Sequence, residues 1–195
     1  MRYGIHTRLK RGRRISVFFT MRCPLQCSYC SMKALLKPND PHNELDLDQW
    51  KLTLLRLFKF MPIRELYVTG GEPTLRPDLS AFINFLLDQG KCVTLHSNLW
   101  TENAMAVKQT DKFRIESTYH GKDNLKRYME TLNKYQSKYR VDVTEIEQNE
   151  IVGSYVKPFE LHGAEIGGST DRFAVAPDGS MWTRMSMLYK HMGVK

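Results

Sequence analysis

Short runs of β-branched and aromatic residues alternate with amphipathic helical segments along most of this chain. The apolar runs, each typical of a strand, lie at residues 15–20, 65–69, 92–98, 112–118 and 140–147. Apolar residues with helical periodicity follow at residues 46–62, 76–90 and 123–139, and a short helix is expected at residues 101–108. Five rounds of strand and helix predict an α/β fold with parallel strands joined by right-handed crossovers.

Several helix ends and faces can be predicted. Asp46 or Asp48 is a candidate N-cap for the first helix, and Pro62 ends it. Pro77 suits the first turn of the second helix, and Gly90 suits its C-terminal cap. Thr101 is a candidate cap for the short helix. The last helix is expected to bury the residues that share one apolar stripe: Leu125, Met129, Leu132 and either Tyr135 or Gln136.

The loops that follow the predicted strands carry the chemically interesting residues. They are the cysteine loop after residue 20, "GGEP" after residue 69, "SN" at residues 97–98 and "STYH" at residues 117–120. In parallel α/β folds ligands bind at the carboxyl ends of the strands, so these loops are expected to meet at one edge of the sheet.

Three cysteines, Cys23, Cys27 and Cys30, have a C-x3-C-x2-C spacing in the first of these loops. A structural zinc site completed by His42 is one interpretation, but such sites usually pair two short knuckles and only one is present. A [4Fe–4S] cluster is the other: three thiolates bind three irons, and the fourth iron is left for a non-protein ligand such as a chelating amino acid. The remaining cysteine, Cys92, lies in a predicted buried strand, where a lone cysteine is usually a small apolar residue.

The stretch "CPLQCSYC" at residues 23–30, followed one helix later by "TGGEPTLRPDL" at residues 69–79, resembles the radical S-adenosylmethionine (SAM) superfamily. It is most similar to the branch that holds the molybdenum-cofactor cyclase and the peptide-modifying enzymes with auxiliary clusters. The similarity is clear over residues 15–98 and extends more weakly to residue 147. It implies a partial barrel of five or six strand–helix units, open on one side, with a parallel sheet and outer helices.

The resemblance also implies roles for individual residues. Cys23, Cys27 and Cys30 would bind a [4Fe–4S] cluster, and SAM would chelate the open iron through its amine and carboxylate. Tyr29, the aromatic residue of the triplet, would lie by the adenine. The methionyl amine of SAM would be held by Gly70, Gly71 and Glu72. Glycines let the backbone approach closely, and a carboxylate can pair with an ammonium.

Further SAM contacts are expected at the ends of the third and fourth strands. Ser97, Asn98 and Ser117 are candidates for binding the ribose, with ordinary loop capping as the alternative. Relatives often have a glycine after the asparagine, and here Leu99 stands in its place. No catalytic residue can be assigned.

Candidates facing the substrate are Tyr119, His120 and either Glu145 or Glu147, and a buried His–Tyr pair is the alternative for the first two. The reaction implied is one-electron reduction of the cluster and homolysis of the SAM C5′–S bond, after which a 5′-deoxyadenosyl radical takes a hydrogen atom from substrate.

The end of the chain departs from the peptide-modifying relatives. The stretch "RFAVAPDGSMWTRM" at residues 172–185 is expected to form a hairpin about Pro177-Asp178-Gly179, but Thr183 and Arg184 stand where relatives continue into a cysteine. No auxiliary cluster is therefore expected. We divide the chain into a basic arm at residues 1–14, a radical SAM core at 15–147 and an irregular segment with the hairpin at 148–195. A sixth barrel strand is expected in either "IVGSYV" or "RFAVA".

Composition bears on partners and location. No apolar run approaches the roughly 18 residues that span a membrane, and "ISVFFT" is too short for a signal-peptide core, so a cytoplasmic protein without membrane partners is expected. The net charge of +8 suits an acidic electron donor such as flavodoxin or ferredoxin.

Three functions remain open from the sequence. The first is a radical SAM enzyme acting on a peptide, a protein or a small molecule, so that the substrate can be a macromolecule. The second is a radical SAM enzyme acting on a nucleotide, tRNA or cofactor precursor. The third is a metal-binding module that has lost catalysis. Nucleic acid is a possible partner, but no basic face with stacking aromatics points to it.

Overall fold

The computed structural model describes residues 13–25, 27, 30, 44–120, 124–145 and 173–182. Within these ranges, seven strands form one sheet in the order β5-β4-β3-β2-β1-β6-β7. Their bounds are Arg13–Thr20 (β1), Ile63–Gly70 (β2), Cys92–Ser97 (β3), Phe113–Tyr119 (β4), Val141–Glu145 (β5), Phe173–Val175 (β6) and Met181–Trp182 (β7). Neighbouring strands from β5 through β6 are parallel, and β7 is antiparallel to β6. Within the described residues the sheet does not close, which confirms the open α/β architecture.

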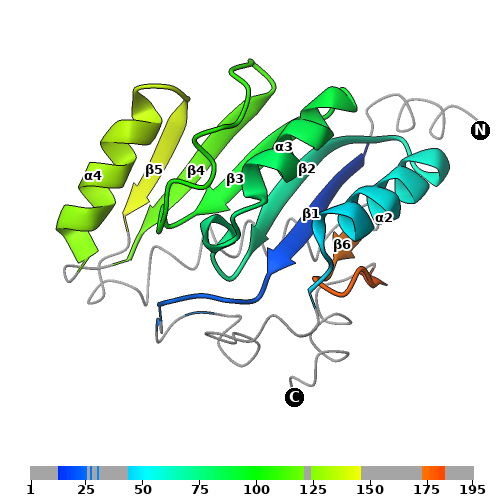
Figure 1. Cartoon of the computed structure of the whole chain (residues 1–195), viewed down its shortest axis with the longest axis horizontal. Coiled ribbons are helices and arrows are strands. Elements are labelled where there is room, and N and C mark those ends of the chain that lie inside the picture. The colour runs from blue at the N-terminus through cyan, green and yellow to red at the C-terminus, as the bar shows by residue number, and fades with distance from the viewer. Residues whose placement is uncertain are drawn as a thin grey trace, which may run out of the picture.

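In the described part of the chain, three helices cover one face of this sheet (Figure 1). They are α2 (Leu47–Phe60), α3 (Leu79–Asp88) and α4 (Leu125–Gln136), and a 3₁₀ turn, η1, spans Pro73–Leu75. Of the two candidate N-caps, Asp46 is the one that caps α2, through a capping box with Gln49. Gly90 has φ of +73° just beyond the end of α3, as expected for a C-terminal glycine. Pro77, in contrast, precedes the Asp78 N-cap and lies outside the helix.

An aromatic cluster ties the helices to the end of β1. The Phe19 ring stacks on Phe82 of α3 with centroids 4.3 Å apart, and Trp50 of α2 lies within 6 Å of both rings, at 5.9 and 5.7 Å. All three side chains are fully buried. Because Phe19 is the residue before Thr20, where the strand ends, this packing fixes the position from which the cysteine loop leaves the sheet.

The short helix predicted at residues 101–108 is absent, because residues 101–107 form bends and turns. The prediction for α4 was right for two positions and wrong for two others. Leu132 and Tyr135 are buried as expected, together with Tyr128, whereas Leu125 and Met129 are 47% and 43% exposed. Both tyrosines have buried polar partners for their hydroxyls: the Tyr135 hydroxyl accepts from the Ala104 amide and donates to the Thr101 carbonyl, and the Tyr128 hydroxyl is hydrogen-bonded to Ser117 of β4.

The predicted hairpin about Pro177 is present. Its first strand lies in one of the two segments in which a sixth strand was expected. Within "RFAVA", β6 pairs with β1, at the side of the sheet away from β5. The other candidate, residues 151–156, lies outside the described residues. Gly179 in the turn has φ of +80°, and its amide donates to the Ala176 carbonyl. The segment in front of α2 contacts this turn, since the Leu45 amide donates to the Pro177 carbonyl at 2.8 Å.

Within the described ranges, no helix has the length and apolar character needed to cross a membrane.

Candidate active site

The start of the cysteine loop is held against the glycine pair that ends β2. The Gly71 amide donates to the Thr20 carbonyl at 2.8 Å, and the Glu72 amide donates to the Arg22 carbonyl at 2.7 Å. A Cβ at Gly70 would lie 2.1 Å from the Thr20 oxygen, and a Cβ at Gly71 would lie 2.2 Å from the Arg22 oxygen. Gly70 also has φ of +130°. Only glycines allow the two backbones to approach this closely.

The cysteines follow directly on this contact. Cys23 is buried, and loss of solvation raises the pKa of its thiol to about 12. Cys27 and Cys30 are partly exposed, and the Cys30 amide donates to the Cys27 carbonyl at 3.2 Å. Among the described residues, no three Cys, His, Asp or Glu side chains converge on a point that would hold a metal ion.

The donor set nevertheless fits a cluster with three protein ligands. Three thiols lie within eight residues of one loop, two of them accessible. Cys92, half-buried where full burial was expected, begins β3, at the opposite end of the sheet from this loop. It is therefore not placed to supply a fourth thiolate.

His120, just beyond β4, reaches the same loop. Its Nδ1 lies 3.7 Å from the Cys27 sulfur, and burial lowers the pKa of the imidazole to about 4. Tyr119 points the other way, and its ring packs against Tyr128 of α4 at a centroid distance of 5.0 Å. Of the two residues, His120 is therefore the one near the cysteines. Tyr29, Glu147 and the side chain of Glu145 lie outside the described part of the chain.

Glu72 is fully buried and has four hydrogen-bond donors around its carboxylate. Oε1 accepts from the Thr74 amide (2.8 Å), the Thr74 hydroxyl (2.5 Å) and the Ser97 hydroxyl (2.7 Å), and Oε2 accepts from the Asn98 amide (2.7 Å). Burial raises the pKa of this carboxyl, and the hydrogen bonds oppose that shift. The side chain thus links the end of β2 to the end of β3, a structural role that the motif alone did not suggest.

Glu72→Gln is expected to destabilise the protein by about 1–3 kcal/mol, because an amide nitrogen would face a buried donor in place of an acceptor. Urea unfolding measures the difference, with Glu130→Gln on the exposed face of α4 as the control. Equal stability of the two variants would show that the carboxylate does not hold the strand ends together.

The end of β3 carries the other predicted SAM contacts. The Ser97 hydroxyl, besides donating to Glu72, accepts from the Leu99 amide at 2.8 Å. Leu99 has φ of +53°, so the chain makes a left-handed turn here without the glycine of the relatives. The Asn98 Oδ1 atom is buried and has no hydrogen-bond partner within the described residues. A buried amide oxygen without a partner is suited to accept a ligand hydroxyl.

Ser117 lies beside Ser97 in the ladder of β3 and β4, but its hydroxyl does not join this group. Its hydroxyl and that of Tyr128 are hydrogen-bonded at 2.8 Å, on the side of the sheet that α4 covers. The structure thus brings Gly70, Gly71, Glu72, Ser97 and Asn98 together, and the hydroxyl of Ser117 is engaged elsewhere.

A polar group that the motifs do not reveal lies on the face of the sheet opposite the helices. Its members are Tyr67, Thr94, His96, Arg114 and Glu116. Arg114 binds the Thr94 hydroxyl and Glu116, each at 3.1 Å, and His96 lies 3.4 Å from Glu116. Polar residues at every second position of "CVTLHS" and "FRIEST" are the sequence signal for such a face.

Comparison with known families decides where the chain belongs. The model of the radical SAM superfamily matches residues 17–115, just over half of the chain. The chain is a member of the radical SAM superfamily. Proteins of this superfamily use a [4Fe–4S] cluster and SAM, and the matched region holds the three cysteines and the glycine pair.

Individual relatives lie near the branch expected from the motifs. A PqqA peptide cyclase of Bradyrhizobium diazoefficiens is 36% identical over 90 residues, which cover 46% of this chain and 22% of that protein. A GTP 3′,8-cyclase of Sulfurimonas denitrificans is 36% identical over 103 residues, 50% of this chain and 28% of that protein. This radical SAM chain therefore matches less than a third of the length of either relative.

A solved structure shows the same fold. The crystal structure of Streptococcus suis SuiB bound to precursor peptide SuiA superposes with a TM-score of 0.53 at 14% identity, over 93% of this chain and 63% of that one.

Proposed function

We propose that this chain is a radical SAM enzyme that cleaves SAM reductively and abstracts a hydrogen atom from a peptide, a protein or a small molecule. The observation that carries the proposal is the contact between the cysteine loop and the glycine pair, in which a Cβ on either glycine would overlap the Thr20 or Arg22 carbonyl oxygen. Such a close approach brings the cysteine loop and the glycine pair to one place, where both could contact the same bound group.

The residues have separate tasks in this proposal. Cys23, Cys27 and Cys30 would hold a [4Fe–4S] cluster, and Tyr29 would lie beside the adenine of SAM. The backbone at Gly70 and Gly71 would face the methionyl amine. When bound and reduced, the cluster supplies the electron that breaks the C5′–S bond of SAM.

Glu72 fits a positioning role better than direct binding of the amine, since its carboxylate is buried and already has four donors. Ser97 would act with it, whereas the buried Asn98 oxygen, which has no partner in the described part of the chain, would accept from the ribose. A ribose contact by Ser117 requires its hydroxyl to leave Tyr128. His120, whose Nδ1 lies 3.7 Å from the Cys27 sulfur, would face a substrate beside the cluster loop.

Asn98→Ala is expected to lower SAM affinity about tenfold, the loss of one hydrogen bond to a ligand. Stability should change little, because the Asn98 amide nitrogen that binds Glu72 belongs to the main chain. Isothermal titration of SAM into the reconstituted protein measures the affinity, with Asn133→Ala on the exposed side of α4 as the control. Unchanged affinity would remove Asn98 from the SAM site.

The proposed activity is tested by anaerobic reconstitution with iron and sulfide, reduction with dithionite and addition of SAM. Mass spectrometry then measures 5′-deoxyadenosine. Its formation, dependent on reductant, supports the proposal. A protein that binds the cluster and leaves SAM intact would favour a module without catalysis.

The relatives favour a peptide as the first substrate class to test. One relative is named a peptide cyclase, and the SuiB structure contains a precursor peptide. The similarity to a GTP 3′,8-cyclase favours a nucleotide as the second class. Peptides and nucleoside triphosphates added in parallel should differ in how strongly they stimulate formation of 5′-deoxyadenosine.

The electron donor is proposed to be an acidic flavodoxin or ferredoxin. The net charge of +8 supports such a partner, since opposite charge speeds encounter. The rate of cluster reduction by flavodoxin should then fall as salt is raised, and a rate independent of salt would contradict electrostatic docking.

A further inference from the structure

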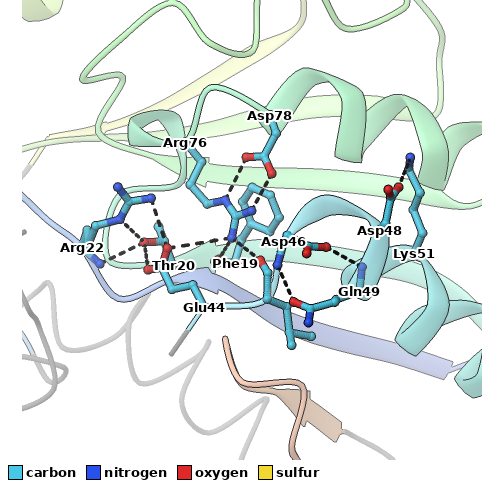
Figure 2. Close-up of polar contacts among 11 residues, drawn as sticks. Phe19, Thr20, Arg22, Glu44, Asp46, Asp48, Gln49, Lys51, Arg76 and Asp78 are labelled. Atoms are coloured by element: carbon cyan, nitrogen blue, oxygen red, sulfur yellow. Dashed lines mark hydrogen bonds and ion pairs between the residues drawn. The ribbon is translucent and has the colours of Figure 1, made fainter. Parts of the chain in front are cut away.

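The cysteine loop leaves the sheet at Thr20 and the chain returns to the same place at Glu44. The Glu44 side chain is 8% exposed and contacts three consecutive residues at the start of the loop. Its Oε1 accepts from the Thr20 hydroxyl and from the Met21 amide, the latter at 3.2 Å. Its Oε2 lies 3.1 Å from Nη2 of Arg22. The Glu44 carboxylate thus joins the two ends of the segment that contains the three cysteines (Figure 2).

Arg76, from the end of "GGEPTLR", fixes the residue that follows Glu44. Its Nη1 donates to the Leu45 carbonyl at 2.9 Å and to the Phe19 carbonyl at 3.3 Å, and lies 3.9 Å from Glu44. Nε and Nη2 bind Asp78 in a bidentate pair at 2.9 and 2.5 Å. The guanidinium also lies over the Phe19 ring, 4.0 Å from its centroid. Figure 2 shows this side chain between Asp78 and the Glu44 region.

The charges of this network balance. Two carboxylates, Glu44 and Asp78, face two guanidinium groups, Arg22 and Arg76. Removing the Glu44 charge would leave two cations with one anion in a largely buried place, which is unfavourable. The network therefore depends on Glu44 for its charge as well as for its hydrogen bonds.

Thr20 and Arg22 are held from two directions. Their carbonyl oxygens accept from the amides of Gly71 and Glu72, and their side chains bind Glu44. Cys23 is the next residue. Its position relative to the glycine pair is consequently determined by both sets of contacts.

We propose that Glu44 is a positioning residue for the iron–sulfur cluster: by binding Thr20, Met21 and Arg22, it fixes the position of Cys23, which directly follows the residues in contact with the glycine pair. The inference rests on the proposed function, in that the three cysteines bind the cluster. Glu44 itself does not touch the cluster in this role, and acts through Thr20, Met21 and Arg22.

The test uses the full chain with Glu44→Gln, Glu44→Ala and, as a control, Glu102→Gln, which removes an exposed ion pair to Lys134. After anaerobic reconstitution, iron release to a ferrous-ion chelator is timed, and the reduced cluster is examined by electron paramagnetic resonance (EPR). Iron release should be about tenfold faster in Glu44→Ala, intermediate in Glu44→Gln and unchanged in the control. The EPR line shape should change in the Glu44 variants, which a mere loss of stability in a still-folded protein would not produce.

A second measurement does not need the cluster. In the metal-free protein, amide hydrogen exchange at Gly71 and Glu72 should be about tenfold faster in Glu44→Gln than in wild type, because the carbonyls that they bind are no longer held. If the Glu44 variants match wild type in iron release, EPR spectrum and amide exchange, the inference is overturned. If wild type itself binds no cluster, the proposed function fails, and amide exchange alone then decides whether Glu44 holds the loop. If Glu44→Ala does not fold, the same measurements on Glu44→Gln decide whether Glu44 positions the loop.

Discussion

Cys27→Ala is expected to abolish binding of the [4Fe–4S] cluster and to leave the fold unchanged. Cys27 is partly exposed on a loop and belongs to no part of the apolar core, so its thiol contributes little to stability. With two thiolates left on the loop and no other cysteine placed at this end of the sheet, a cubane would lose one of only three protein ligands. Iron and sulfide per chain after anaerobic reconstitution measure the loss.

Cys92→Ala is the matched control. Cys92 is also half-buried, but it begins β3, at the end of the sheet opposite to the cysteine loop. It should bind iron and sulfide as wild type does. Full iron content in Cys27→Ala, or equal loss in both variants, would contradict the assignment of the cluster to this loop.

Gly71→Ala is expected to separate the cysteine loop from the end of β2. The added Cβ would lie 2.2 Å from the Arg22 carbonyl oxygen and 2.9 Å from the Met21 carbonyl carbon, so main chain and not a movable side chain must shift. Overpacking of this kind costs about 1–3 kcal/mol or more. The shift would also break the hydrogen bonds from Gly71 and Glu72, so both urea stability and iron binding should fall.

Gly90→Ala separates the effect of crowding from that of backbone conformation. Gly90 has φ of +73°, but a Cβ there would meet nothing within 4 Å. Its replacement should cost about 1–2 kcal/mol from the left-handed backbone alone and leave iron binding intact. If Gly71→Ala binds iron and SAM as wild type does, the close contact between the loops is not needed for the site.

The sheet and the meeting of its loops could be predicted from the sequence because they depend on periodicity. Phe19, Leu66 and Leu95 occupy strand positions whose alternation and apolar character leave little choice of structure, and parallel strands bring their carboxyl ends to one edge. The three cysteines and the glycine pair follow two of these strands directly. Their proximity therefore follows from topology.

Other features depend on tertiary contacts that have no periodic signal. In α4, tyrosines with hydroxyl partners in the 101–107 turns are buried in preference to Leu125 and Met129, which a count of apolar residues favours. The four donors around Glu72 come from both β2 and β3 ends, and the contacts of Glu44 join residues 24 positions apart. Such polar networks become visible only when the chain is folded.

The most direct test of the proposed site is the EPR spectrum of the reduced, reconstituted protein recorded before and after addition of SAM. If three cysteines bind the cluster, one iron is left open for the amine and carboxylate of SAM. We then expect a [4Fe–4S] signal that changes when SAM is added to wild type, and no signal in Cys27→Ala. A wild-type cluster whose spectrum is the same with and without saturating SAM would contradict the proposed site.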